Sequence, residues 1–546
     1  MRITVLTHRK VCLAIAAVAM AIGASAPVSA QPGATYEVVS TFGAADGKPN
    51  GVIQTFSGQF YGTATMSTPT LPGGPVGTVF AMNAAGARTT LHTFVFFIVP
   101  SLSGDGTPLG NLIEGGDGIV YGTSYNRHDP PIPQGRIFRI SREGVYSTVA
   151  SAHSLEAGVI QASDGRLYGV FEGTVVDPSV RTYGSVFRVE ANAAITVLHQ
   201  FNGTDSASPV GELVETADGP LYGVTEGGNL QPPPSGPLPP PIPAAIFRID
   251  PGTGALAIRH RFANDVRSAG RLIQALDGLL YGTTVNGGDF GLGTVFSLDA
   301  ADTFTTLHHF SGADGANPSA GLIQGGDGRL YGTTRNGGAF GYGTVFVMNP
   351  TGRAITLHDF ELSTGANPVD ELFQANDGTF YGAVPVGGPD GNGVIFRLRV
   401  APVAPEGYVE IVSRNSGKCL DVSFASTAPA APAIQWTCHG GPNQQWRLEP
   451  AGGGAFRIIA RHSGQALDVF GALLDDVAPI IQWPVHGGDN QAWMLESESE
   501  GHVRIVARHS GKAMDVEYAS ADEGARVIQY TPHGGANQQW LLRPVE

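Results

Sequence analysis

The chain has 546 residues, a formal net charge of −15 and only 14% charged residues. We predict no nucleic-acid partner, because contact with a phosphate backbone needs a basic patch that releases counterions, and this chain has almost no Lys clusters. The 76 Gly and 38 Pro suit either disorder or a turn-rich β protein. A hydrophobic fraction of 42%, arranged in short Val, Phe, Tyr and Leu runs, favours the β protein.

Residues 1–30 have the pattern of a secretory signal peptide. Arg2, Arg9 and Lys10 precede an apolar run of 14 residues from Val11, and Val28-Ser29-Ala30 offers a small-residue cleavage site. The run is shorter than the roughly 20 residues of a membrane span, and no later segment is long and apolar enough to be one. A retained membrane anchor is the alternative. We expect a protein secreted to an extracellular or periplasmic location, with no transmembrane segment after signal removal.

Residues 36–400 repeat one unit seven times. Tyr-Gly recurs at intervals of 47 to 60 residues, and six of the seven copies follow an Asp-Gly pair, which predicts a tight hairpin because both central residues must tolerate positive φ. The Tyr-Gly tyrosines are Tyr61, Tyr121, Tyr168, Tyr222, Tyr281, Tyr331 and Tyr381. The Asp-Gly aspartates are Asp117, Asp164, Asp218, Asp277, Asp327 and Asp377.

Each unit of about 50 residues contains four short strands, which is typical of one blade of a β-propeller. The segment 36–42 has the pattern of a last strand, and the array closes at Val400 partway through a unit. We therefore predict that the first and last strands complete one blade of a seven-bladed propeller. An open β-solenoid is the alternative, because the period alone does not distinguish closed from open stacking.

The consensus "DGxLYGTTxxGGxxGxGTVF" resembles the GloVer-type tandem repeat of bacterial exported proteins, best over residues 277–347. This resemblance bears on architecture alone.

Two sets of polar residues recur in the repeat region. Equivalent strands carry His92, His199, His260, His308 and His358, which we interpret as hydrogen-bonded to neighbouring turns, since equivalent positions in a wide ring are too far apart to share a metal. Glu172 and Glu226 each follow a Tyr-Gly tyrosine by four residues in adjacent units. They are weak catalytic candidates, because glycoside hydrolysis uses two carboxyl groups about 5 to 9 Å apart and solvated loop acids are far commoner.

After a linker at residues 401–406, a different repeat occupies residues 407–546. Asp421, Asp468 and Asp515 lie 47 residues apart, and so do Trp446, Trp493 and Trp540. The three copies of Gln-x-Trp and of "HGGxNQ" resemble the ricin-type β-trefoil lectin, in which Gln-x-Trp marks each of three lobes. The resemblance implies a C-terminal β-trefoil and places the three motif tryptophans in its core.

Two cysteines remain after signal removal, Cys419 and Cys438. In an oxidising compartment they are expected to form a disulfide, since two thiolates alone cannot fill a tetrahedral zinc site. A disulfide within one lobe is also frequent in the lectin family.

Each lobe is predicted to bind a sugar, which offers an apolar C–H face and a rim of hydroxyls. An Asp accepts hydroxyls, an aromatic or His lies against the ring, an Asn donates and accepts, and a Gln supports the carboxylate. The ligand-binding candidates are Asp421, Trp436, His439, Asn443 and Gln444 in the first lobe, Asp468, Trp483, His486, Asn490 and Gln491 in the second, and Asp515, Tyr530, His533, Asn537 and Gln538 in the third. The prediction requires the three acids to face an open pocket.

The sequence therefore predicts an all-β protein, a seven-bladed β-propeller followed by a β-trefoil, without cofactor or metal. Its expected partners are glycans or polysaccharides, bound with avidity by three weak sites. The propeller is a scaffold or a second recognition surface. The alternative is a secreted glycoside hydrolase or lyase with a catalytic propeller, and the residues leave the sugar and the oligomeric state open.

Overall fold

The structure is a computed structural model, and the predicted signal peptide and linker lie outside its described residues. Described are residues 34–545 except 67–73, 96–104, 110–111, 127–133, 154, 156, 174, 178–179, 182, 228–241, 264–265, 268–270, 350–351, 353, 401–406, 453–454 and 499–501.

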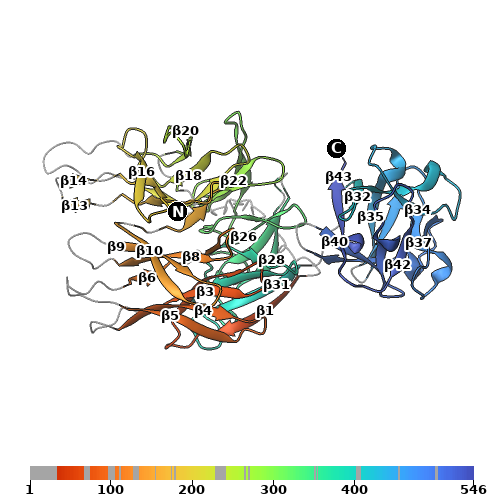
Figure 1. The fold of residues 1–546 in the computed structure, drawn as a ribbon, viewed down its shortest axis with the longest axis horizontal. Coiled ribbons are helices and arrows are strands. Elements are labelled where there is room, and N and C mark those ends of the chain that lie inside the picture. The colour runs from red at the N-terminus through yellow and green to blue at the C-terminus, as the bar shows by residue number, and fades with distance from the viewer. Residues whose placement is uncertain are drawn as a thin grey trace, which may run out of the picture.

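Residues 34–400 form seven antiparallel sheets arranged as the blades of a propeller (Figure 1). The first three blades contain β2 (Lys48–Gln54), β3 (Phe60–Thr65), β4 (Pro75–Met82) and β5 (Arg88–Val95); β6 (Thr107–Pro108), β7 (Ile113–Glu114), β8 (Val120–Asn126), β9 (Gln134–Ile140) and β10 (Tyr146–His153); and β11 (Val159–Gln161), β12 (Leu167–Phe171), β15 (Ser185–Val189) and β16 (Ile195–Gln200). A separate hairpin joins β13 (Val175–Asp177) to β14 (Val180–Arg181).

The next three blades keep the same strand order. They contain β17 (Pro209–Glu215), β18 (Leu221–Thr225), β19 (Ala245–Ile249) and β20 (Leu256–Arg261); β21 (Ile273–Gln274), β22 (Leu280–Thr284), β23 (Thr294–Leu298) and β24 (Phe304–His309); and β25 (Ile323–Gln324), β26 (Leu330–Thr334), β27 (Thr344–Met348) and β28 (Ala354–Asp359).

The seventh blade closes the ring. Its strands are β29 (Phe373–Gln374), β30 (Phe380–Val384) and β31 (Val394–Val400) from the end of the repeat, and β1 (Ala34–Thr41) from the beginning. β1 pairs antiparallel with β31, from Ala34 opposite Val400 to Thr41 opposite Val394. The predicted closure by the first and last strands is confirmed, and the open solenoid is wrong.

The Asp-Gly pair and the tyrosine after it form one structural unit. In the sixth blade Gly328 has φ 78°, as the turn requires, and the Tyr331 hydroxyl donates to Asp327 Oδ2 at 2.7 Å. The same bond is made in other blades by Tyr121, Tyr168 and Tyr281. The spacing of Asp and Tyr in these four blades thus follows from a hydrogen bond that fixes the hairpin.

The glycine of Tyr-Gly makes room for the phenylalanine of the following strand. A Cβ on Gly332 would lie 2.7 Å from Phe346 Cζ, closer than packed carbon atoms can approach. The equivalent glycine of every other blade faces a phenylalanine in the same way. Since these phenylalanine rings are buried, one Gly–Phe contact builds the core of each blade.

The recurring histidines divide into two groups. His92, His199 and His308 contact an Asp of the following turn, at 3.1, 2.9 and 2.7 Å, which confirms their predicted hydrogen bonding. His260 instead stacks on Phe304, and His358 stacks on Tyr36. Burial lowers the pKa of His260 and lowers that of His358 to about 4, so these two rings serve as neutral aromatic packing.

The C-terminal domain is a closed barrel of six strands with three hairpins. The barrel strands are β32 (Val409–Ser413), β35 (Gln445–Gly452), β36 (Ala455–Ala460), β39 (Trp493–Ser497), β40 (His502–Ala507) and β43 (Trp540–Pro544), and β32 pairs with β43. The hairpins are β33 (Cys419–Val422) with β34 (Ala433–Trp436), β37 (Ala466–Val469) with β38 (Ile480–Trp483), and β41 (Ala513–Val516) with β42 (Val527–Tyr530). This is the predicted β-trefoil.

The three motif tryptophans form the centre of the trefoil core. Trp446, Trp493 and Trp540 are fully buried in one apolar cluster. Their indole Nε1 atoms donate to the carbonyls of Leu420, Leu467 and Met514 at 3.1 to 3.2 Å. Each tryptophan therefore holds the strand that carries the candidate Asp of its own lobe. Within the part of the chain that the structure describes, no helix has the length and apolar character of a membrane span.

Candidate functional site

Three elements bring the candidate residues of each lobe together. The Asp lies on the first strand of the hairpin, and the aromatic ends the second strand. The Asn and Gln lie on a short 3-10 turn, which is η2 (Pro442–Gln444), η4 (Asp489–Gln491) or η7 (Ala536–Gln538). The structure thus gathers every predicted Asp, Gln and His of a lobe into one cluster, three times over.

The Gln holds the carboxylate and the loop that carries the His. In the first lobe, Gln444 Nε2 donates to Asp421 Oδ2 at 2.8 Å, and Gln444 Oε1 accepts the backbone N–H of His439 at 2.8 Å. Gln491 and Gln538 make the same pair of bonds in the second and third lobes. Because all three Gln are fully buried, they position the other residues rather than face a ligand.

The Asn links the carboxylate to the end of its strand. Asn443 Nδ2 donates to Asp421 Oδ2 and Asn490 Nδ2 to Asp468 Oδ1, both at 2.9 Å. Asn490 and Asn537 also donate to the carbonyls of Val469 and Val516. In the second and third lobes a single amide therefore connects the cluster to the turn that follows the Asp strand.

The His side chains cover the acids. Nε2 of His439, His486 and His533 lies 3.5, 3.1 and 3.2 Å from the Asp Oδ2 of the same lobe. In each lobe the backbone N–H two residues later, as at Gly488 for His486, donates to His Nδ1 at 3.1 Å. Since Nδ1 accepts, the neutral ring carries its hydrogen on Nε2, directed at the carboxylate. The outer side of each His ring is exposed.

The three carboxylates lie at the floor of their lobes. Asp421, Asp468 and Asp515 are each 3% exposed, so they are less open than the sequence analysis required. Burial raises the pKa of each carboxyl above its ordinary value, and the amide and His contacts act in the opposite direction. A ligand hydroxyl can reach an acid only beside, or in place of, the His ring.

The carboxylates differ in the oxygen left for a ligand. All contacts of Asp421 reach Oδ2, and among the described residues its Oδ1 accepts no hydrogen bond. Asp468 accepts from Asn490 at Oδ1 and from Gln491 at Oδ2, so both its oxygens are engaged. The second lobe therefore has less capacity than the first to accept a ligand hydroxyl.

The aromatic candidates lie at the rim. Trp436, Trp483 and Tyr530 are 40%, 38% and 37% exposed, the range expected of a ring with one face open. Tyr530 meets the ring of His533 edge to face, with centroids 5.9 Å apart. In the third lobe an aromatic and a His thus stand side by side over the buried acid.

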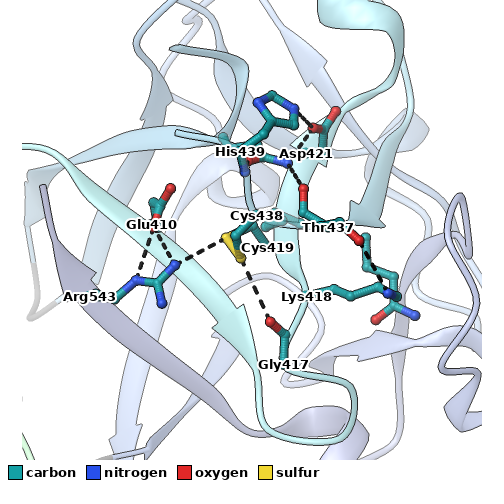
Figure 2. The surroundings of a disulfide bond; sticks show 12 residues. Glu410, Gly417, Lys418, Cys419, Asp421, Thr437, Cys438, His439 and Arg543 are labelled. Atoms are coloured by element: carbon teal, nitrogen blue, oxygen red, sulfur yellow. Dashed lines mark hydrogen bonds and ion pairs between the residues drawn. A yellow bond between two sulfur atoms is a disulfide. The ribbon is translucent and has the colours of Figure 1, made fainter. Parts of the chain in front are cut away.

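Cys419 and Cys438 form the predicted disulfide, with Cα atoms 5.1 Å apart (Figure 2). It connects the strand of Asp421 to the loop of His439, as Figure 2 shows. Beside it, the Arg543 guanidinium binds Glu410 and approaches Cys419 Sγ at 3.8 Å. The first lobe is thus held by a covalent link that the other two lack.

The weak catalytic candidates lie in adjacent blades, directly after equivalent strands. Glu172 follows β12 and is partly buried, whereas Glu226 follows β18 and is exposed. The backbone N–H of Glu226 donates to Ser208 O at 2.9 Å. No group of three or more His, Cys, Asp or Glu side chains is placed to hold a metal ion among the described residues.

A second charged cluster, which the sequence analysis did not single out, joins Glu212 on β17 to Arg271 and Glu371, which lie two residues before β21 and β29. Arg271 Nη1 lies 3.1 Å from Glu212 Oε2 and also binds Glu371 Oε2. These residues come from the fourth, fifth and seventh blades, whose first strands line the ring. The equivalent positions of three other blades hold Gly51, Gly158 and Gly321. Charged residues at a position that is glycine in these blades were the available signal.

The chain was compared with protein-family models and with known proteins. The Gloeobacter/Verrucomicrobia repeat matches residues 242–413, and the ricin-type beta-trefoil lectin domain-like family matches residues 396–483 and 486–546. The search of curated proteins finds no match.

Similar solved structures include the designed threefold-symmetric protein ThreeFoil, 53% identical over 26% of this chain and 100% of its own, with a TM-score of 0.25. An exo-beta-1,3-galactanase from Clostridium thermocellum is 20% identical over 80% of this chain and 95% of its own, with a TM-score of 0.30. The Macrolepiota procera ricin B-like lectin, in complex with lactose, is 22% identical over 26% of this chain and 99% of its own, with a TM-score of 0.23. The barrel, the three buried Gln-x-Trp tryptophans and the family match agree that the chain ends in a ricin-type β-trefoil lectin-like domain, which follows a Gloeobacter/Verrucomicrobia repeat region.

Proposed function

We propose that this chain is an exported carbohydrate-binding protein that holds glycans or polysaccharides in the lobes of its trefoil. The observation that carries the proposal is the cluster of buried Asp, buried Gln and exposed His beside a half-exposed aromatic, present in all three lobes. Folding does not require a carboxylate at the floor of each lobe, since burying one costs free energy. The propeller acts as a scaffold or a second recognition surface.

Each lobe supplies the two kinds of contact that a sugar needs. The aromatic and the exposed His ring present flat surfaces to the C–H face, and the carboxylate accepts a hydroxyl. A single shallow site of this kind is weak, about millimolar, so three sites on one domain gain their strength from a repeating polysaccharide.

The test is binding of the full-length protein to a glycan array and to xylan and galactan in affinity gels. Asp421→Asn, Asp468→Asn and Asp515→Asn together keep the shape of each side chain and remove its charge. We expect the triple variant to lose at least about ten-fold in apparent affinity, since charge-assisted bonds are worth about 1.5–3 kcal/mol each. Asp390→Asn, an exposed propeller acid, is the control. Binding by the triple variant equal to wild type would reject the proposal.

Export by residues 1–30 is a separate part of the proposal. The disulfide in the first lobe supports an oxidising compartment. N-terminal sequencing of protein from culture medium or periplasm should begin at Gln31, and deletion of residues 2–30 should retain the protein in the cell. Full-length protein found only in the cytoplasm would contradict export.

A second candidate function, polysaccharide hydrolysis by the propeller, is supported by the inner charged cluster. Glu212 and Glu371 both reach Arg271 Nη1, and burial raises the pKa of Glu371 to about 7, a value suited to a general acid. Release of reducing ends from xylan and galactan tests this function. Activity lost in Glu371→Gln but kept in Glu172→Gln/Glu226→Gln would assign it to the inner cluster, and the reverse would assign it to the loop acids.

A further inference from the structure

A turn with a left-handed middle residue follows the Asp strand in every lobe. The turns are η1 (Ser423–Ala425), η3 (Phe470–Ala472) and η6 (Glu517–Ala519), and the middle residue of each lies three positions after the pocket Asp. These middle residues are Phe424, Gly471 and Tyr518, with φ of 56°, 63° and 58°. Glycine is the residue that adopts this left-handed backbone without cost, and the second lobe has it. The first and third lobes place a bulky aromatic there instead.

The two aromatic rings gain nothing from packing. Phe424 is 100% exposed and Tyr518 is 92% exposed. A fully solvated ring on a left-handed backbone is unfavourable for folding, and glycine at the same position of the second lobe shows that the turn forms without it. Backbone strain of this kind persists at binding sites, where the side chain has a use that the folded chain itself does not provide.

In the second and third lobes the turns are joined to the binding clusters by hydrogen bonds. Asn537 Nδ2 donates to the carbonyl of Val516, the residue directly before η6, and Asn490 makes the same bond to Val469 before η3. In the third lobe η6 packs against η7, the turn that carries Asn537. Each ring lies three positions along the chain from its Asp, a span of at most about 10 Å, which is the scale of one or two sugar units.

The hydrogen bonding of the carboxylate differs between the first and second lobes, as the middle residue of the turn does. Asp421, in a lobe with an aromatic turn, keeps Oδ1 free of hydrogen bonds to the described residues, whereas Asp468, in the glycine lobe, has both oxygens engaged. Compared with the first lobe, the lobe without an exposed ring therefore also has the less available acid.

We propose that Phe424 and Tyr518 are sugar-stacking platforms that contact the C–H face of a pyranose unit of the glycan held in the first and third lobes, and that the second lobe binds more weakly because Gly471 offers no ring. The inference rests on the proposed function and refines it. The polar surroundings of Asp, Asn and His favour a sugar over a lipid as the occupant, since a sugar needs an apolar face and hydroxyl partners together.

The experiment measures binding of the full-length protein to lactosyl-agarose, to xylan beads and to liposomes of neutral phospholipid. The variants are Phe424→Ala, Tyr518→Ala, their double, and Gly471→Tyr. Phe56→Ala, an exposed ring in the propeller, is the matched control. Each single Ala variant should weaken sugar binding about three-fold to ten-fold, as loss of one aromatic contact does. The double should lose more than either single, Gly471→Tyr should strengthen binding, and the control should bind as wild type.

The outcomes separate this inference from the function on which it rests. Sugar binding that is lost in the triple Asp→Asn variant but unchanged in Phe424→Ala/Tyr518→Ala overturns the platforms and leaves the lectin function standing. Binding of wild type to neither lactosyl-agarose nor xylan overturns both. Loss of liposome binding in the double variant, with sugar binding intact, would assign the rings to a lipid surface and also overturn the inference.

Discussion

At the scale of single residues, the binding lobes combine favourable and unfavourable features in a way that points to function. Each buried Asp is stabilised by amide and His contacts, yet burial still raises its pKa. Phe424 and Tyr518 hold left-handed backbone angles while fully solvated. Both features reduce the stability of the trefoil, and both lie beside the same cluster.

Relief of backbone strain should therefore stabilise the trefoil. Phe424→Gly and Tyr518→Gly are each expected to raise the free energy of unfolding by about 0.5–1 kcal/mol, because glycine adopts positive φ freely and loses part of that gain to its flexible unfolded chain. Urea unfolding measures the change. Gly471→Ala is the reverse control and should lower the free energy of unfolding by a similar amount. Unchanged stability in all three variants would show that the turns relax without strain.

At the scale of elements, each blade depends on a glycine that accepts a phenylalanine ring. This pairing is visible in the sequence, because Tyr-Gly and the later Phe recur together in all seven units. The structure supplies the reason, which is the contact of the Phe ring with the space where a Cβ would lie.

Gly332→Ala should consequently destabilise the sixth blade. The new methyl group would meet Phe346 and Leu322 at less than 3 Å, and overpacking of this kind costs about 1–3 kcal/mol. Thermal unfolding of the full-length protein is the measurement. Gly116→Ala is the control, because its Cβ would meet only Gln161 Oε1 at 3.7 Å. Equal melting of the two variants would contradict the proposed packing rule.

The disulfide between Cys419 and Cys438 stabilises the first lobe. Cys419→Ser with Cys438→Ser should lower trefoil stability by about 3 kcal/mol, because the open loop gains conformational entropy when unfolded. Sugar binding in the second and third lobes should remain, since their clusters contain no cysteine. A melting curve with and without reductant checks the first expectation, and a variant as stable as wild type would refute it.

At the scale of the whole molecule, ring closure assembles a charged cluster that no local segment contains. Glu212, Arg271 and Glu371 meet although 100 residues separate the last two. Only 14% of the Glu371 side chain is exposed to solvent, as expected for a residue that lies beside the central axis of the propeller. Burial raises the pKa of Glu371 to about 7 and raises that of Asp370 as well, with Arg271 opposing both shifts.

This cluster predicts how propeller stability depends on pH. A carboxyl whose pKa is raised by folding stabilises the fold fully below its unfolded pKa of about 4.5, and that contribution is lost as pH rises through about 7. The melting temperature should therefore fall between pH 5 and pH 8, by the equivalent of roughly 2–3 kcal/mol. Glu371→Gln should flatten the decline, and Glu361→Gln, outside the cluster, should not. A wild-type profile that is flat over this range would disprove the assignment.

Much of the architecture was predictable because it follows from local rules. Asp-Gly turns, Tyr-Gly pairs and the 47-residue intervals of Asp421 and Trp446 are repeated in sequence, so the number of blades and lobes could be counted. Closure of the ring was also predictable, since the order of the strands requires β1 to complete the last blade. The disulfide was predicted from two cysteines in a chain whose first 30 residues have the pattern of a signal peptide.

The remaining features could be seen only in the structure, because they depend on contacts between residues that are distant in the sequence. Burial of the three acids beneath His rings, the spare oxygen of Asp421 and the engaged oxygens of Asp468 arise from contacts between separate elements. The left-handed angle of Phe424 is a property of a turn that glycine also forms, so residue type did not reveal it. Repetition along the chain specified the fold, whereas the chemistry of each lobe and of the propeller axis was decided by packing between residues far apart in sequence.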